Sequence, residues 1–261
     1  MNNDLQGKTA IVTGAASGIG AAVARLYGQY GANVMLSDTD ENLGQQVTEA
    51  IKATGANARF FKADASDPDQ CRQLVQETVS AFGRLDMACN NAGVLGEQSL
   101  TADYSVAGWQ RVINVNLNGV FYCLKYELEA MLKQESGGSI VNMASILGQV
   151  GTAQLAAYVA AKHGVIGLTQ TAAIEYATDQ ITLENRRPTG IRINAVGPAY
   201  IETPLLNVLG DGGKQALVAL HPIGRLGRAE EVAELVIWLS SDKASFVTGA
   251  YYPVDGGYLA K

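Results

Sequence analysis

The chain has 261 residues, of which 48% are hydrophobic and 17% are charged, enough to build a sizeable core. Its formal net charge is -6 at pH 7, and no basic run exceeds the pair Arg186 and Arg187, which argues against nucleic-acid binding. No apolar stretch approaches membrane-spanning length, and the polar first residues lack the pattern of a secretion signal. We therefore expect a soluble protein that binds neither membranes nor nucleic acid.

The three cysteines and two histidines do not form a metal or redox motif. Cys71, Cys89 and Cys123 are odd in number and lack the spacing of a zinc or disulfide-exchange site. His163 and His221 do not cluster with acids or cysteines in the sequence, so both are expected to be structural. We expect reduced thiols, no metal ion and a cytoplasmic location.

Short β-branched runs alternate with longer amphipathic segments along the chain. The expected strands are 9–13, 33–37, 58–62, 85–90, 139–143, 191–196 and 252–254. The expected helices are 19–30, 42–54, 69–82, 108–133, 155–177 and 229–240. This alternation predicts an α/β fold, a doubly wound Rossmann-type parallel sheet with helices on both faces. No repeat or linker divides residues 1–261, which are expected to form a single domain with loops at 178–189 and 201–222.

A glycine-rich turn follows the first expected strand, in the run Thr13-Gly14-Ala15-Ala16-Ser17-Gly18-Ile19-Gly20. Glycine lets the backbone approach a pyrophosphate at the start of a helix, where free N–H groups and the helix dipole favour an anion. The spacing G-x-x-x-G-x-G is weak by itself, because other strand-to-helix turns also tolerate glycine. The turn therefore predicts a dinucleotide only together with its surroundings.

Asp38 supplies those surroundings, at the end of the second expected strand. A carboxylate at this place can accept hydrogen bonds from an adenosine ribose hydroxyl, and it would repel a 2'-phosphate. Its neighbours Ser37, Thr39 and Asp40 offer no compensating arginine, so NAD(H) is favoured over NADP(H). Alternatively, Asp38 could serve only as the N-cap of the next helix.

Two further segments lie where a cofactor would bind. Asp64, after the third expected strand, could accept from an adenine amino group or could simply close a turn. The run Asn90-Asn91-Ala92-Gly93 follows the fourth strand, at the carboxyl edge of the sheet where cofactors lie, although its composition also suits a tight turn.

Tyr158 and Lys162 predict the chemistry of the site. A four-residue spacing on a helix places the phenol and the ammonium on one face. A nearby ammonium favours the phenolate and so lowers the pKa of the tyrosine, which lets it exchange a proton with an alcohol oxygen. Ser145, at the end of an apolar run, could hold that oxygen, while a separate acceptor would take the hydride. An ordinary helix pair remains the alternative for the tyrosine and lysine.

Taken together, the motifs resemble those of the short-chain dehydrogenase/reductase family, in its compact single-domain branch, over nearly the whole length. Beyond the glycine turn and the run at 90–93, the matching segments are Val115-Asn116-Leu117-Asn118-Gly119, Ser145, Tyr158-x-x-x-Lys162 and Ile191-Arg192-Ile193-Asn194-Ala195-Val196-Gly197-Pro198. Their order and spacing are more specific than any single motif.

The resemblance implies a role for each matching residue. Tyr158 would be the general acid/base, Lys162 would lower its pKa and hold the nicotinamide ribose, and Ser145 would orient the substrate oxygen. Asn116 would join the proton relay by fixing a water near Lys162, unless it merely braces its helix. The implied cofactor-binding residues are Gly14, Ser17, Gly18, Ile19, Gly20, Asp38, Asp64, Ala65, Asn91, Ala92, Gly93, Tyr158, Lys162, Pro198, Ile201 and Thr203. The expected substrate-binding residues are Ser145, Leu147, Gln154, Tyr158 and Tyr200.

These residues favour an NAD-dependent oxidoreductase that interconverts a secondary alcohol and a ketone. The alternatives are an NADPH-dependent 3-oxoacyl-carrier-protein-type reductase, which Asp38 disfavours, and a non-catalytic dinucleotide-binding protein. Apolar positions, which include Leu95, Ile146 and the segment 205–209, suggest a hydrophobic or modestly polar substrate. The resemblance also implies a homotetramer that packs through the helices beginning at Gly108 and Leu155.

Overall fold

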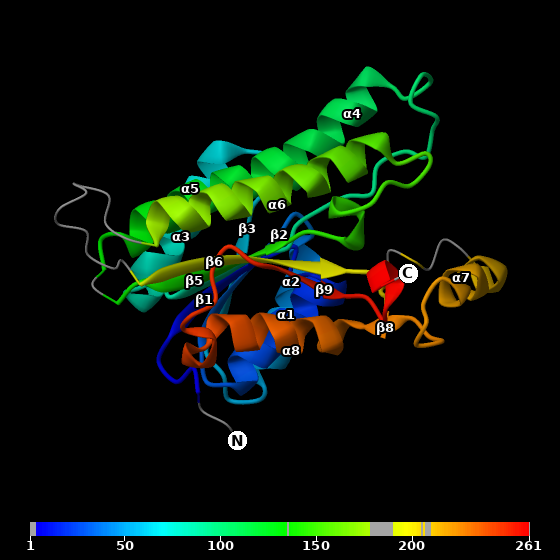
Figure 1. The fold of residues 1–261 in the computed structure, drawn as a ribbon. Coiled ribbons are helices and arrows are strands. Elements are labelled where there is room, and N and C mark those ends of the chain that lie inside the picture. The colour runs from blue at the N-terminus through cyan, green and yellow to red at the C-terminus, as the bar shows by residue number, and fades with distance from the viewer. Residues whose placement is uncertain (1–3, 135, 178–189, 205, 207–209, 261) are drawn as a thin grey trace.

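A seven-stranded parallel sheet forms the centre of the protein, as a computed structural model shows (Figure 1). The structure describes residues 4–134, 136–177, 190–204, 206 and 210–260. The strands are β1 (Thr9–Thr13), β2 (Asn33–Asp38), β3 (Ala58–Lys62), β4 (Met87–Asn90), β5 (Gly138–Met143), β6 (Ile191–Pro198) and β9 (Tyr251–Val254). Their order in the sheet is β3-β2-β1-β4-β5-β6-β9. The predicted doubly wound α/β fold is confirmed.

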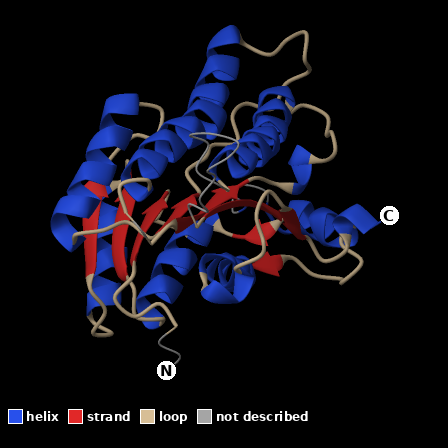
Figure 2. Cartoon of the chain, turned by 60° about the vertical axis from the view of Figure 1, so that its left-hand side comes forward, coloured by secondary structure: helices blue, strands red, loops and turns tan. Residues whose placement is uncertain are grey.

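Helices cover both faces of this sheet (Figures 1 and 2). One face carries α1 (Gly18–Gln29), α2 (Glu41–Lys52) and α8 (Ala229–Ser240). The other carries α3 (Pro68–Phe82), α4 (Val106–Ile113), α5 (Gly119–Met131) and α6 (Ala156–Tyr176). Alternate residues of β1 enter the two layers: Ala10 and Val12 pack towards α1 and α8, and Ile11 packs towards α3 and α5. Burial on both faces explains why the middle of this strand, Ala10 to Val12, is apolar on both sides.

Local sequence signals set the helix ends. Asp67 caps α3 by accepting hydrogen bonds from the Asp69 and Gln70 amides, Pro68 occupies the first turn, and Gly83 ends the helix with φ +80°. Asp40 caps α2 and accepts from the Leu43 amide at 3.0 Å. These caps place the strand-to-helix turns, which hold most of the candidate site.

The continuous helix expected at 108–133 is three pieces. It begins two residues earlier, because the Ser105 hydroxyl accepts from the Gly108 amide and caps α4. A π-helical turn, Asn114–Asn118, then separates α4 from α5. Such turns insert a residue into the helix and often mark functional sites.

The loop expected at 201–222 also contains regular structure. A two-residue strand β7 (Ile201–Glu202) pairs in parallel with β8 (Gly227–Arg228) in a separate small sheet. The helix α7 (Gly210–Ala219) follows, and the glycines in its first turn had suggested a loop. Short 3-10 turns occur at Ile146–Gly148, Asp242–Ala244 and Tyr258–Ala260. The loop expected at 178–189 lies outside the described residues.

Candidate active site

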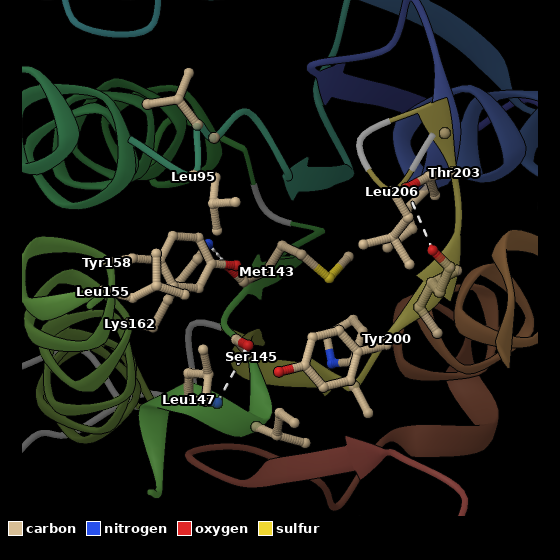
Figure 3. Close-up of a pocket in the computed structure, with 18 of the residues that line it drawn as sticks. Leu95, Met143, Ser145, Leu147, Leu155, Tyr158, Lys162, Tyr200, Thr203 and Leu206 are labelled. Carbon is tan, nitrogen blue, oxygen red and sulfur yellow. Dashed lines mark hydrogen bonds between the residues drawn. The ribbon is translucent and has the colours of Figure 1, made fainter. Parts of the chain in front are cut away.

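A cavity of about 600 Å³ opens at the carboxyl edge of the sheet. Its walls come from the segments after β1, β4, β5 and β6 and from the first turns of α6 (Figure 3). The chain order of the strands reverses between β1 and β4, which is where doubly wound sheets bind their ligands. The size suits a small organic ligand beside part of a larger cofactor.

The turn after β1 requires glycine at two places. Gly14 has φ +64°, and a Cβ there would lie 2.9 Å from the Ala92 Cα. A Cβ on Gly20 would lie 2.1 Å from the Gly14 carbonyl oxygen. The helix α1 then starts at Gly18 without a side-chain cap from Ser17, so its first N–H groups can receive an anion. The turn therefore fits the pyrophosphate of a dinucleotide.

Thr13 and Asn91 tie this turn to the end of β4. The Thr13 hydroxyl oxygen accepts from the amides of Asn91 and Ala92, at 3.0 and 3.1 Å. The Asn91 side-chain amide donates to the carbonyls of Thr13 and Gly14, at 3.0 and 3.1 Å. Asn91 thus shapes the cavity wall through contacts within the protein.

Asp38 faces the glycine turn from the end of β2. Its carboxylate accepts from the Ala16 amide at 3.0 Å and from the Asp40 amide at 3.0 Å. The alternative that Asp38 serves only as a helix N-cap is wrong, because Asp40 caps α2. Asp38 instead lines the cavity beside the turn, where a ribose hydroxyl would meet it.

A neighbouring cavity of about 470 Å³ extends from Asp38 and contains Asp64, Ala65 and Ala92. The Asp64 carboxylate accepts from the amide and hydroxyl of Ser66, at 2.8 and 2.7 Å, so its side chain closes a turn. Arg111 of α4 also lines this cavity, a cation that the sequence pattern around Asp38 did not reveal.

Ser145 lies two residues after the end of β5 and lines the cavity. It is buried, and its hydroxyl oxygen accepts from the Leu147 amide at 3.2 Å. Its own carbonyl accepts from the Tyr251 hydroxyl at 3.0 Å, which anchors the backbone to β9. Both contacts fix the direction in which the serine hydroxyl points.

Lys162 lies one helical turn after Tyr158 on α6, as the spacing predicted. It is 3% exposed, and its ammonium donates to the Met143 carbonyl at 2.7 Å. The ammonium nitrogen lies 5.6 Å from the centre of the Tyr158 ring. Burial lowers the pKa of Lys162 to about 8, so charge on this group is costly but partly retained near neutrality.

The pKa of the Tyr158 phenol shifts in the direction opposite to the one expected from the sequence. Burial raises its pKa above the ordinary value, the Ser145 hydroxyl acts in the opposite direction, and Tyr200 raises the pKa further. The expectation that Lys162 gives the phenol a lowered pKa is wrong for the protein's own groups. Desolvation of the phenolate outweighs the nearby ammonium, which is itself desolvated.

Asn116 sits in the π-helical turn and is fully buried. Its side-chain oxygen accepts from the Val94 amide and its side-chain nitrogen donates to the Val94 carbonyl, both at 2.8 Å. The side chain therefore braces the loop after β4, and both its oxygen and its nitrogen are hydrogen-bonded to Val94.

Comparisons with known proteins agree with this geometry. A family model described as enoyl-(acyl carrier protein) reductase matches residues 14–259. A cyclohexanol dehydrogenase from Acinetobacter sp. (strain SE19) is 48% identical over 100% of this chain and 98% of its own. The chain belongs to the short-chain dehydrogenase/reductase family.

Two further relatives of this short-chain dehydrogenase/reductase are a dehydrogenase and a reductase, by their names. A cis-4-hydroxycyclohexanecarboxylate dehydrogenase from Sinomonas cyclohexanicum is 44% identical over 97% of each chain. A crystal structure of levodione reductase has a TM-score of 0.91 at 35% identity and covers 98% of this chain and 99% of its own. Enzymes of the family use a nicotinamide dinucleotide, and relatives of this chain are alcohol dehydrogenases.

The cavity gathers most of the residues expected from the sequence. Those that line it are Gly14, Ser17, Gly18, Ile19, Asp38, Asn91, Gly93, Ser145, Leu147, Gln154, Tyr158, Lys162, Pro198, Tyr200, Ile201 and Thr203. Gly20 and Asn116 do not line the cavity, but they contact residues that do: Gly20 lies against Gly14, and Asn116 holds the backbone of Val94. Of the expected substrate segment 205–209, the structure describes only Leu206, which lines the cavity.

Met143 and Leu217 are among the contributors to the short-chain dehydrogenase/reductase site that sequence reasoning missed. Met143 holds the lysine through its carbonyl, and its place two residues before Ser145 was the available signal. Leu217 reaches the cavity from α7, and the apolar run 216–220 could have indicated a helix there.

No helix among the described residues is long and apolar enough to cross a membrane. These residues also contain no group of three or more His, Cys, Asp or Glu side chains placed to hold a metal ion.

Proposed function

We propose that the protein is an NAD-dependent oxidoreductase that interconverts an alicyclic secondary alcohol and its ketone. The observation that carries this proposal is the meeting of Ser145, Tyr158 and Lys162 in one cavity that reaches Asp38. A serine, a phenol and a buried ammonium suit proton exchange at a substrate oxygen. We further propose that residues 1–261 act as one NAD-binding domain.

In the proposed mechanism, the Ser145 hydroxyl holds the substrate oxygen and Tyr158 takes its proton during alcohol oxidation. Bound NAD supplies the hydride acceptor and a positive nicotinamide charge. Lys162, fixed by the Met143 carbonyl, keeps two further N–H groups, which would hold a ribose hydroxyl. The Asn116 backbone carbonyl is proposed to hold the water that returns the proton to solvent.

Asp38 supports the choice of NAD. Its carboxylate is fixed by the Ala16 and Asp40 amides, so it cannot easily turn away from a ribose 2'-oxygen. A 2'-phosphate would meet this charge directly. Gly14, Gly18 and Asn91 are proposed to shape the pyrophosphate and nicotinamide sites, and Pro198, Ile201 and Thr203 to border the nicotinamide.

The substrate proposal rests on the other end of the cavity. Leu95, Leu147, Leu155 and Leu206 form an apolar wall, and the polar side chains of Gln154 and Tyr200 lie in the same lining. Figure 3 shows Leu95, Leu147 and Leu155 near Tyr158 and Ser145, and Leu206 beside Thr203 on the opposite side of the view. Such a lining fits a saturated ring with one oxygen at the catalytic serine. Names of relatives that include cyclohexanol and hydroxycyclohexanecarboxylate are consistent with that choice.

A cofactor and substrate screen tests the proposal. Cyclohexanol with NAD is expected to produce NADH, and cyclohexanone with NADH the reverse reaction, because the apolar lining matches the ring. Absorbance in the NADH band measures both, with a straight-chain secondary alcohol as the comparison. NADH binding without turnover of any ring alcohol or ketone would instead support the non-catalytic reading.

The carrier-protein reductase remains a second candidate, since the matching family model carries an acyl-carrier-protein description. If this second function is correct, the protein reduces an acyl group on a carrier protein with NADPH. It should then prefer that reaction to the reduction of a free cyclic ketone with NADH. The same assay with a 3-oxoacyl substrate separates the two functions.

We also propose a cytoplasmic homotetramer. Phe121 of α5 and Ile174 of α6 are 47% and 74% exposed, and Trp238 of α8 is 38% exposed. Apolar side chains on two faces of a monomer favour association. Light scattering is expected to give four times the chain mass of 27.5 kDa. A monomer at micromolar concentration would contradict this, and a Phe121→Glu variant that dissociates would locate one interface.

A further inference from the structure

A glutamate is buried between α5 and the sheet, with no cation beside it among the described residues. Glu127 is 0% exposed, and one carboxyl oxygen, Oε2, accepts from the Asn90 side-chain nitrogen at 2.9 Å. The other oxygen, Oε1, is buried and has no hydrogen-bond partner among the described residues. The mechanism above uses neither atom.

Asn90 continues this contact into the sheet. Its side-chain nitrogen also donates to the Asn142 side-chain oxygen at 3.0 Å, across from β4 to β5. The Asn142 nitrogen donates to the Thr169 hydroxyl at 2.9 Å, on α6. The Asn90 side-chain oxygen, however, is a second buried atom with no partner in the described part of the chain. Two unpartnered oxygens thus belong to two side chains that are already bonded to each other.

A proton on Glu127 would give a hydrogen-bond partner to both unpartnered oxygens, Glu127 Oε1 and the Asn90 side-chain oxygen. A carboxylate only accepts hydrogen bonds, so an ionised Glu127 would leave two buried acceptors unsatisfied. A neutral carboxylic acid has one O–H, which can donate from Oε1 to the Asn90 oxygen while Oε2 accepts from the Asn90 nitrogen. The acid and the amide then form a closed ring of two hydrogen bonds.

The surroundings favour the neutral acid. Among the described residues, the ionisable groups whose charge interacts with Glu127 are Tyr27 on α1, Cys89 on β4 and Cys123 on α5. A phenol and two thiols cannot carry positive charge, and neither β5 nor the π-helical turn contributes an ionisable side chain. Burial raises the pKa of Glu127 to about 7, and the Asn90 hydrogen bond opposes this only in part.

The pair stands directly behind the candidate active site. Asn90 precedes Asn91, which clamps the glycine turn, and Asn142 precedes Met143, whose carbonyl holds Lys162. We propose that Glu127 is a positioning residue, a neutral acid that pairs with Asn90 and thereby fixes the ends of β4 and β5 beneath the cofactor turn and Lys162. The positioning part rests on the function proposed above; the protonation part does not.

Two substitutions separate protonation from shape. Glu127→Gln keeps both hydrogen bonds, since an amide can donate and accept in the same ring, and it cannot ionise. It is expected to leave kcat and the KM for NAD within about 2-fold of wild type. Glu127→Met removes both bonds at similar volume. It is expected to raise the KM for NAD by about 10-fold and to shift the pH profile of kcat/KM, because Asn91 and the Lys162 acceptor lose their support.

The stability of wild type and of the Glu127 variants should depend on pH in different ways. The folded pKa of Glu127, about 7, exceeds its ordinary value of 4.5, so its stabilising effect is complete below pH 4.5 and is lost as pH rises to about 7. Between pH 4.5 and about 7, the melting temperature of wild type is therefore expected to fall relative to that of Glu127→Gln. Above about pH 7, the difference between the two melting temperatures should stay constant. Glu129→Gln is the matched control, an exposed glutamate of the same helix that pairs with Lys125, and it should show no such widening.

Infrared spectroscopy tests the protonation directly, without substrate. At pH 6 the wild type is expected to show the C=O stretch of a protonated buried carboxyl that Glu127→Gln lacks and Glu129→Gln retains. Absence of that band, or a melting-temperature gap that is constant from pH 4.5 to pH 8, would overturn the neutral acid. A folded Glu127→Met with unchanged NADH affinity and pH profile would overturn the positioning role. A protein that turns over no alcohol but shows the band would leave the acid–amide pair standing and remove only the proposed function.

Discussion

Tyr158→Phe is expected to lower kcat by about 10² to 10⁴-fold, because it removes the only group proposed to exchange a proton with the substrate oxygen. The aromatic ring and its contact with Lys162 remain, so the cavity keeps its shape. The dissociation constant for NADH should stay within about 2-fold of wild type. NADH absorbance gives the turnover, and quenching or enhancement of fluorescence gives the binding.

Tyr200→Phe is the matched control for this change. Tyr200 lines the same cavity and packs edge-on against His221 and Tyr258, with ring centres 5.8 and 6.1 Å away. Loss of its hydroxyl should alter KM for the substrate more than kcat. If Tyr158→Phe kept more than a few per cent of wild-type turnover, Tyr158 would not be the acid/base.

The second large effect concerns the cofactor. Wild type is expected to use NADH about 100-fold better than NADPH in kcat/KM, since placing a phosphate against the Asp38 carboxylate costs several kcal/mol. Asp38→Asn keeps an oxygen that can accept from the Ala16 amide but removes the charge. Its preference for NADH should fall by at least about 10-fold. Steady-state assays with both cofactors at one ionic strength measure the change.

Asp40→Asn controls for the loss of a carboxylate two residues away. Asp40 is exposed and caps α2, a role that asparagine fills nearly as well, so cofactor preference should not change. Arg111, which lines the adjoining cavity, is the group that could rescue NADPH use. A wild type that prefers NADPH would overturn the assignment of Asp38, whatever the variants do.

The sequence predicted the sheet and its ligand edge because those features depend on local patterns. Apolar strands such as 9–13 and capped helices such as the one after Asp67 carry their signals within a few residues. The turn at Gly14 and the spacing of Tyr158 and Lys162 likewise need no distant partner to be recognised. For this reason the sequence alone predicts most of the residues that line the cavity.

The parts that were wrong depend on contacts between distant segments. The π-helical turn forms where Asn116 must meet both polar groups of Val94, a contact across 22 residues that no helical periodicity reports. Glycines in the first turn of α7 made its short pattern look like a loop. The pKa of Tyr158 depends on how deeply the fold buries it, which a four-residue spacing does not state.

The Tyr251 hydroxyl has a consequence for how the site is assembled. It crosses from β9 to the Ser145 carbonyl, and 106 residues of chain separate the two. A ribosome therefore delivers the serine long before the residue that anchors it, and β9 is the edge strand that joins the sheet beside β6. During synthesis the cofactor turn can form early, whereas a correctly aimed serine must wait for the last strand. A nascent chain that stops short of β9 would thus hold the earlier strands of the sheet with the Ser145 carbonyl unanchored.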